Sequence, residues 1–273
     1  MKPLVFPRQT LKNSVSFCGK GVHTGAAVKA AVHPGKDGII FRHGKNHWKA
    51  CPENVTRTEL CTCLGEISTI EHLMSAFAGL GITDAEVELT GLELPAMDGA
   101  SLAFCQELQV TAGFEEIGTE RLMFPSEEVF VEDSLTRISV KGGEGNIQYT
   151  FESGERWPKS QTYRFRFDSA KSYMKEIALA RTFCFEEQVP QILSAGLGQG
   201  LDETTALIIG EHGYVNQEKF PDEPARHKIL DLMGDLYLAG VPLQFLDIKA
   251  KRGGHALNVR MAAEILRHVK KES

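Results

Sequence analysis

Short β-rich runs come first and helices follow in each half of this chain, and that order most constrains its fold. From Val15 to Thr90 the sequence alternates short strands with turns around one helical stretch, about residues 69–80. Strand-like runs resume at Val129, and a helix over about 261–270 ends the second half. Because strands and helices do not alternate regularly and no glycine-rich phosphate loop follows a strand, the order disfavours a dinucleotide-binding fold. It predicts layered α/β sandwiches.

The boundary between the halves is predicted where periodicity is lost, over residues 111–121. Before it, residues 85–89 alternate like a strand, and a turn over 94–99 leads into a helix near 100–110. Gly113, Gly118 and acidic residues fill the aperiodic segment, which is typical of a linker. We therefore expect two domains, residues 1–115 and 121–273.

The charge and hydropathy patterns exclude several classes of protein. A net charge of −6 with scattered basic residues disfavours a nucleic-acid partner, since phosphate binding normally leaves a concentrated basic surface. No apolar run approaches the roughly 20 residues that span a bilayer, and the first residues are too short and proline-broken for a signal peptide. We expect a cytoplasmic monomer without a transmembrane segment.

Six cysteines are spread over the chain. Such spacing favours free thiols in a reducing compartment over a disulfide framework. Cys61-Thr62-Cys63 lacks a second pair at zinc-finger spacing, so a strand or loop of small apolar residues is favoured there over a metal site.

The most informative segment is 223–240, which opens with a proline in its first turn and closes on a glycine, as a helix of several turns does. His227, Asp231 and Asp235 recur every four residues and share one stripe beside an apolar band. The same spacing also occurs on solvated helices, where a lone histidine binds nothing. A metal site therefore needs a third ligand.

That ligand is sought in Ser68-Thr69-Ile70-Glu71-His72, where a helix begins. A zinc hydrolase needs about three protein ligands, a water, and a carboxylate outside the coordination sphere to accept the water's proton. His72 and Glu71 suit these roles. Ser68 and Glu71 also match a helix capping box, in which the carboxylate only satisfies backbone donors. Spacing alone leaves both interpretations open.

A further histidine, His255, follows Gly253-Gly254 on an expected turn. An exposed turn suits a proton donor, although an isolated loop histidine is more often merely solvated. Its importance depends on its neighbours.

Taken together, these segments resemble the UDP-3-O-acyl-N-acetylglucosamine deacetylase family, zinc enzymes of the committed step of lipid A synthesis in Gram-negative bacteria. The resemblance covers nearly the whole chain. It rests on six motifs in the same order: Gly21-Val22-His23-Thr24-Gly25, Ser68-Thr69-Ile70-Glu71-His72, Leu94-Pro95-Ala96-Met97-Asp98-Gly99, Ala180-Arg181-Thr182-Phe183, Arg226-His227-Lys228 through Leu238, and Arg252-Gly253-Gly254-His255.

The resemblance implies an α+β fold of two similar two-layer sandwich domains, packed helix face to helix face, with a small insertion in each. It implies Zn²⁺ bound by His72, His227 and Asp231. Glu71 is then the general base and His255 the proton donor. Two further roles are implied, with Asp235 orienting His255 and Thr182 stabilising the oxyanion.

The same resemblance implies a lipid-bearing UDP-sugar as substrate, with an acyl passage built from an insertion at about 182–206. Its implied substrate contacts are Lys228, which would meet the diphosphate, and Phe183, His23, Gly200 and Cys63. Apolar residues suited to a hydrocarbon tail are Phe183, Phe185, Val189, Ile192, Leu193, Ala195 and Leu197. An ordinary amphipathic helix would carry the same residues.

Two segments depart from the family pattern. The family commonly reads Gly-x-Gly-Gly-Ser where this chain has Gly198-Gln199-Gly200-Leu201-Asp202, and serine where it has Ala100. The first departure concerns the wall of the acyl passage, and neither concerns a metal ligand.

Two rival interpretations remain at this stage. A zinc amidohydrolase acting on another acylated amino sugar would share His72, Glu71, His227 and Asp231. A structural or RNA-binding α/β module would merely pack the same histidines, and would contain no stoichiometric zinc.

Overall fold

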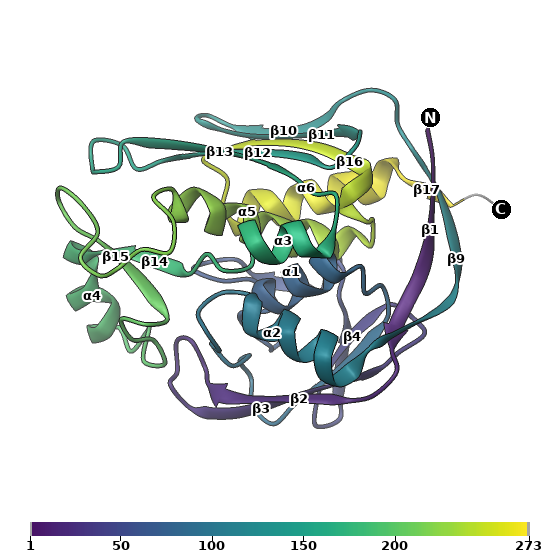
Figure 1. The fold of residues 1–273 in the computed structure, drawn as a ribbon, viewed down its shortest axis with the longest axis horizontal. Helices are drawn as coiled ribbons and strands as arrows, with labels where there is room; N and C mark the ends of the chain where they lie inside the picture. Colours follow the sequence, from purple (N-terminus) through teal and green to yellow (C-terminus); the bar gives the residue numbers. More distant parts are fainter. Residues whose placement is uncertain (1, 272–273) are drawn as a thin grey trace.

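The computed structural model describes residues 2–271. Figure 1 shows four layers, with one β-sheet at the top, another at the bottom, and two layers of helices between them. Each sheet turns one face to the helices and the other to solvent. The expected α+β fold of two sandwiches packed helix to helix is confirmed.

The first sheet has the strand order β2-β3-β8-β4-β5. Its strands are β2 (Val15–Lys20), β3 (Ala27–Pro34), β4 (Ile39–His43), β5 (Asn46–Lys49) and β8 (Ala85–Leu89). Only the β4–β8 pair is parallel. Phe41 and Val87 face each other across that pair and are fully buried, and burial of such a side chain contributes about 1.5–3 kcal/mol.

The second sheet repeats this topology in the order β10-β11-β16-β12-β13. Its strands are β10 (Val129–Asp133), β11 (Thr136–Gly142), β12 (Asn146–Glu152), β13 (Ser160–Arg166) and β16 (Leu246–Lys251). The parallel pair again joins the central strand, β16, to its neighbour β12, and Ile147 faces Ile248 there. The chain thus builds the same sheet twice, although no repeat of residue identity was visible in the sequence.

The helices between the sheets are α1 (Glu71–Leu80), α2 (Leu102–Glu107), α3 (Ala170–Glu176), α5 (Glu223–Leu236) and α6 (His255–His268). α1 and α5 approach closely at Gly234, where an added Cβ would lie 2.1 Å from the Glu71 carbonyl oxygen. The Tyr237 hydroxyl, just after α5, donates to the Ile82 carbonyl at 2.9 Å. Glycine at 234 therefore sets how near Glu71 lies to α5.

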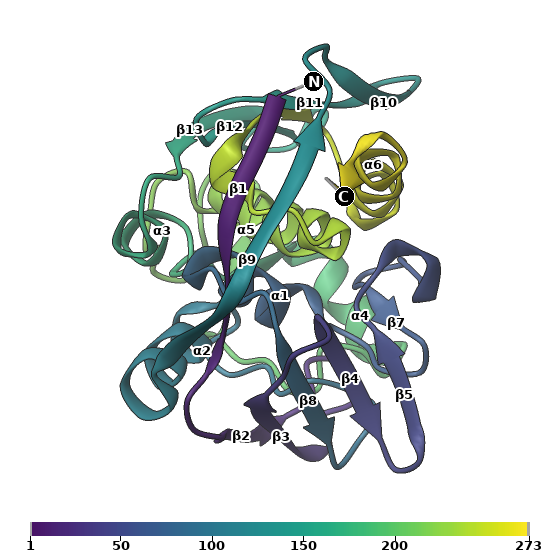
Figure 2. The same ribbon diagram turned by 90° about the vertical axis from the view of Figure 1, so that its right-hand side faces the viewer.

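The segment predicted as a linker is an extended strand. β9 (Phe114–Phe124) pairs along its length with β1 (Lys2–Leu11) and, at its end, with β17 (Lys270–Lys271). Figure 2 shows β1 and β9 running together along one side of the molecule from the lower sheet to the upper. Its alternation was hidden because most of its side chains are exposed on both faces.

Two insertions interrupt the repeated topology. The first contains a short 3₁₀ turn (Pro52–Asn54), β6 (Val55–Arg57) and β7 (Cys63–Leu64). The second contains β14 (Thr182–Phe185), a 3₁₀ turn (Glu186–Gln188), α4 (Val189–Ser194) and β15 (Ala206–Ile209). Figure 1 places the second insertion at the left end of the helix layers. No helix among residues 2–271 is long and apolar enough to cross a membrane.

Candidate metal centre and active site

Three side chains predicted as metal ligands converge between the two halves. His72 is the second residue of α1, and His227 and Asp231 lie one turn apart on α5. The Oδ1 atom of Asp231 is 3.3 Å from His227 Nε2 and 3.7 Å from His72 Nε2. Their three ligand atoms lie within 4.8 Å of one another, and all three residues are buried. Among residues 2–271 this is the one His/Cys/Asp/Glu group so arranged.

Burial favours the neutral form of both histidines, and His227 presents a lone pair to the cluster. Burial lowers the pKa of His72 to about 3, and burial also lowers the pKa of His227. The Nδ1 atom of His227 is 3.0 Å from the Ala180 carbonyl, which only accepts, so Nδ1 carries the proton and Nε2 is free to coordinate.

The Asp231 carboxylate has one satisfied oxygen and one without a partner. Burial would raise its pKa, but the adjacent Lys228 ammonium helps to lower it below the ordinary range, so the group is ionised. Lys228 Nζ lies 2.7 Å from Oδ2, whereas the buried Oδ1 has no hydrogen bond. An ionised, buried oxygen without a donor fits a cation, and two imidazoles with one carboxylate are a donor set of catalytic zinc sites.

Glu71 does not cap its helix. No side chain caps the start of α1, and the Ser68 hydroxyl donates instead to the Leu92 carbonyl at 3.1 Å. The Glu71 carboxylate is buried and accepts the Thr62 backbone N–H at 2.9 Å. Burial raises the pKa of Glu71 well above its usual value, which favours proton uptake. The capping-box interpretation is therefore wrong.

His255 is not on an exposed turn but is the first residue of α6, which begins about six residues before the predicted helix. Its side chain is only 10% exposed, and Nδ1 lies 2.9 Å from Asp235 Oδ2. Although burial disfavours the cation, the Asp235 carboxylate raises the pKa of His255 to about 10. Held this way, the ring carries a proton at neutral pH and leaves Nε2 free to donate it.

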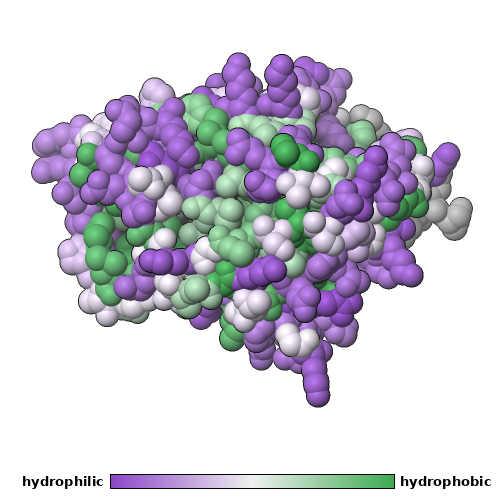
Figure 3. All heavy atoms as spheres, turned by 60° about the horizontal axis from the view of Figure 1, so that its bottom comes forward, coloured by the Kyte–Doolittle hydropathy of each residue, from purple (hydrophilic) through white to green (hydrophobic). Residues whose placement is uncertain are grey.

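A largely apolar cavity of about 560 Å³ adjoins Glu71 and His72. Its wall contains His23 and Phe183, which were predicted to contact substrate, and Thr182, which was predicted to stabilise the oxyanion. Of the proposed acyl-binding residues, Phe183, Val189, Ile192, Leu193 and Leu197 line it, whereas Phe185 and Ala195 do not. Figure 3 shows hydrophobic side chains near the left edge, the side that carries α4 and β14 in Figure 1. Two residues of the cavity lining, Leu193 and Val215, are half exposed.

A family model described as UDP-3-O-acyl N-acetylglycosamine deacetylase matches residues 8–267. Curated relatives carry the name UDP-3-O-acyl-N-acetylglucosamine deacetylase. That of Cellvibrio japonicus is 35% identical over 93% of this chain and 88% of its own length. That of Aquifex aeolicus is 34% identical over 96% and 94%, and that of Campylobacter jejuni strain RM1221 is 36% identical over 94% and 91%.

The chain belongs to the UDP-3-O-acyl N-acetylglycosamine deacetylase family. Within this deacetylase fold, the departure at 198–202 lies against the first half of the chain. Gln199 and Gly200 donate backbone N–H groups to the carbonyls of His23 and Val22, at 3.1 and 3.2 Å. Leu201 and Asp202, which stand where the family pattern has glycine and serine, both line the cavity, and Leu201 contributes apolar surface there.

Three predicted substrate contacts lie outside the cavity wall. Lys228 pairs with Asp231 and keeps its side chain 23% exposed. Gly200 holds its loop by its backbone, and an added Cβ would lie 2.0 Å from the Gly21 carbonyl oxygen. Cys63 is buried, with its Sγ 3.7 Å from that of Cys61 and 3.4 Å from Arg57 Nη2. Their contact with substrate stays a prediction.

Some non-glycine residues with left-handed backbone dihedral angles lie near the site. Leu60, Thr69, Met97 and Arg252 have φ between 51° and 65°. Leu60 and Thr69 line the cavity, and Arg252 precedes the turn into His255. Such conformations cost about 1–3 kcal/mol and persist where the surrounding structure imposes them. Leu60, Thr69 and Arg252 lie two or three residues before Thr62, Glu71 and His255. Their backbone conformations therefore direct the chain into these three residues.

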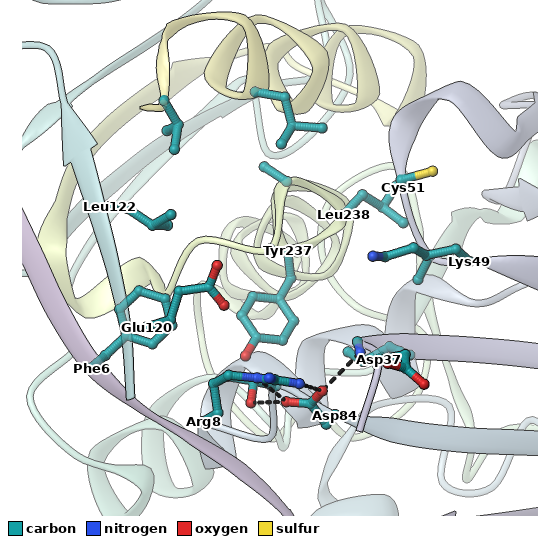
Figure 4. A pocket seen from close by; sticks show the side chains of 18 of the residues that line it. Phe6, Arg8, Asp37, Lys49, Cys51, Asp84, Glu120, Leu122, Tyr237 and Leu238 are labelled. Carbon is teal, nitrogen blue, oxygen red and sulfur yellow. Dashed lines mark hydrogen bonds and ion pairs between the residues drawn. The ribbon is translucent and has the colours of Figure 1, made fainter. Parts of the chain in front are cut away.

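A second cavity, of about 630 Å³, lies between the halves away from these residues. Figure 4 shows Arg8 paired with Asp84 below the ring of Tyr237. Asp84 also accepts the Gly38 N–H at 2.8 Å, so this ion pair ties β1 to the first sheet. No site residue predicted from the sequence lines this cavity.

Two side chains at the site were not predicted. Thr62 donates its hydroxyl to Asp235 Oδ1 at 2.5 Å, and Asn258 donates its amide to Asp235 Oδ2 at 2.9 Å. Asn258 lies one turn after His255 on α6, a spacing that could have suggested it. Thr62 is 173 residues from its partner, and no local pattern connects them.

Proposed function

We propose that this protein is a zinc-dependent deacetylase that hydrolyses the N-acetyl group of UDP-3-O-acyl-N-acetylglucosamine, yielding acetate and UDP-3-O-acyl-glucosamine. The observation that carries the proposal is the unpartnered, ionised Oδ1 of Asp231 between two neutral imidazoles, with Glu71 and His255 alongside. Membership of the deacetylase family supports the reaction, and the apolar cavity beside Glu71 supports a lipid-bearing substrate.

In the proposed mechanism, His72, His227 and Asp231 hold zinc. When bound there, zinc supplies Lewis-acid chemistry toward the acetamide carbonyl and makes a water more acidic. Glu71 accepts the proton of the attacking water, and its raised pKa suits that transfer. The Thr182 hydroxyl, in the cavity wall, donates to the oxygen that gains negative charge.

Departure of the amine requires a proton on its nitrogen. His255 supplies it from Nε2, because Nδ1 is engaged by Asp235. The carboxylate keeps the imidazole cationic until the transfer and fixes the ring's direction. Glu71 and His255 thus have opposite duties. The raised pKa of Glu71 makes it a stronger base than an ordinary carboxylate, and the raised pKa of His255 keeps its ring protonated until the amine departs.

Recognition of the substrate is assigned to both halves. The acyl chain lies along the insertion at about 182–206, and Lys228 meets the diphosphate. His23, Gly200, Phe183 and Cys63 complete the proposed contacts. We propose two domains, residues 1–115 and 121–273. Each five-stranded sheet lies within one of these ranges, which supports the division. The proposed setting is lipid A synthesis in the cytoplasm, by a monomer.

The test is acetate release from UDP-3-O-acyl-N-acetylglucosamine, measured before and after chelation and after zinc is restored. Glu71→Gln keeps the side chain's shape, and we expect a fall of about 10²- to 10⁴-fold in kcat. Glu66→Gln, an exposed carboxylate five residues away, is the matched control. No release by folded, zinc-loaded protein would overturn the substrate assignment and leave another acylated amino sugar to be tested.

A further inference from the structure

Thr62 contacts the residues around both the proposed base, Glu71, and the proposed acid, His255, and has no role of its own in the proposed reaction. It comes from the first insertion, just before β7, and its side chain is fully buried. Its hydroxyl lies 2.5 Å from Asp235 Oδ1 on α5 and 3.2 Å from His255 Nδ1 on α6. A side chain from the first half of the chain therefore contacts both Asp235 and His255, which belong to the second half.

The direction of these hydrogen bonds follows from charge. An ionised carboxylate only accepts, so the Thr62 hydroxyl donates to Asp235 and keeps its lone pairs for His255 Nδ1–H. Asp235 Oδ2 accepts from His255 and from Asn258, both at 2.9 Å. With Thr62 on Oδ1, both carboxylate oxygens are engaged, and rotation of the carboxylate away from the imidazole would break at least one hydrogen bond.

The backbone of the same residue holds the base. The Thr62 N–H donates to Glu71 Oε2 at 2.9 Å. That bond occupies one carboxylate oxygen and leaves Oε1 available for the attacking water. A shift of this residue would therefore move the supports of Glu71 and of the Asp235–His255 pair together.

We propose that Thr62 is a positioning residue that fixes the proton-donating His255, through Asp235, in register with Glu71. The proposal rests on the deacetylation proposed above. A buried threonine that served packing alone would be replaced well by valine, which has the same shape. A threonine that positions the acid through its hydroxyl would be replaced well by serine instead.

The variants Thr62→Val and Thr62→Ser separate these roles. We expect Thr62→Val to lower kcat for acetate release about 10- to 100-fold with little change in KM, since a hydrogen bond to a charged group is lost. Thr62→Ser should stay within a few-fold of the parent. The control is Thr56→Val, which removes an exposed hydroxyl that donates to the Gly65 carbonyl at 2.6 Å in the same insertion.

A double variant tests whether Thr62 acts through Asp235. In an Asp235→Asn background, adding Thr62→Val should cost much less than it does in the parent, because the pair it supports is already disrupted. Independent, multiplicative losses would overturn the proposal, as would a Thr62→Val enzyme with unchanged kcat or a Thr62→Ser enzyme as impaired as valine.

A readout that needs no substrate keeps this inference separate from the proposed reaction. In ¹⁵N-histidine-labelled, zinc-loaded protein, the Nδ1 proton of His255 should resonate downfield, as its hydrogen bond to a carboxylate requires. The His255→Ala variant assigns it. We expect the resonance to persist in Thr62→Ser and to shift or broaden in Thr62→Val. An unchanged resonance in the valine variant, folded by circular dichroism, would refute the positioning role even if the parent released no acetate.

Discussion

His255 donates Nδ1–H to Asp235 across 2.9 Å, joining the first residue of α6 to the last turn of α5. This bond fixes the charge of the proposed proton donor. The carboxylate raises the pKa of His255 to about 10 despite burial, so the cation is present throughout the neutral range.

The alkaline limit of activity should follow from that pairing. Because the cationic form of His255 is the active one, kcat/KM should fall as pH rises through about 10. Asp235→Asn removes the charge that favours the cation, so the limb should move down toward the ordinary histidine value of about 6.5. Profiles of kcat/KM against pH check this. Asp133→Asn, an exposed change, should leave the limb in place, and an unmoved limb in Asp235→Asn would contradict the assignment.

Zinc should bind to the folded protein through Asp231. Since a metal that binds only the native state raises its stability, chelation should lower the melting temperature of the parent. Asp231→Ala should lose stoichiometric zinc and become insensitive to chelator. Metal analysis with thermal scans gives both results. Stoichiometric zinc in the variant would mean that the ion binds elsewhere. Asp222→Ala is the control, because this carboxylate precedes α5 and pairs with Arg226, outside the cluster.

Gly234→Ala should disturb the site through the backbone. The added Cβ would lie 2.1 Å from the Glu71 carbonyl oxygen, so α1 and α5 must separate. We expect a loss of about 1–3 kcal/mol in unfolding free energy and weaker zinc binding. Gly213→Ala is the control, because nothing lies within 4 Å of its Cβ position. Denaturant titration and zinc competition measure the two effects, and parent-like values would show that the helices tolerate separation.

The buried Arg181–Glu223 pair should stabilise the second insertion. Arg181 Nε lies 2.9 Å from Glu223 Oε1, and the side chains are 4% and 0% exposed. Glu223→Ala leaves a buried cation unpaired and should cost about 3–5 kcal/mol. Breaking the Lys159–Glu155 pair, whose side chains are 71% and 94% exposed, should cost at most about 1 kcal/mol. Urea midpoints compare them, and equal shifts would disprove a special role for the buried pair.

Apolar contacts in the cavity should distinguish a lipid-bearing substrate from a small one. Ile192→Asp places a charge on α4, in the cavity wall, and should raise KM for the acylated UDP-sugar at least about 10-fold. Zinc content should not change. Leu135→Asp, at an exposed position on the second half, is the control. An unchanged KM would remove the acyl chain from this cavity and favour a substrate without one.

The sequence by itself determined the elements that local patterns encode. The helix from Glu223 to Leu236 follows from its proline start and its apolar band, and the four-residue spacing of His227, Asp231 and Asp235 puts them on one face. The order of strands and helices predicted the class of fold. These properties depend on spacings of a few residues, which can be read from a single sequence.

Tertiary structure decided which of those side chains meet. The spacing of Ser68 and Glu71 also fits a capping box. Only the structure shows that the Glu71 carboxylate instead points inward and accepts the Thr62 N–H. His255 gained a partner only because α6 begins at it and packs on α5. Thr62 carries no local signal, since its bond to Asp235 joins residues 173 apart in the chain. Long-range contacts of this kind depend on how the helices of the two halves pack against each other. Residue spacing within one segment carries no information about that packing.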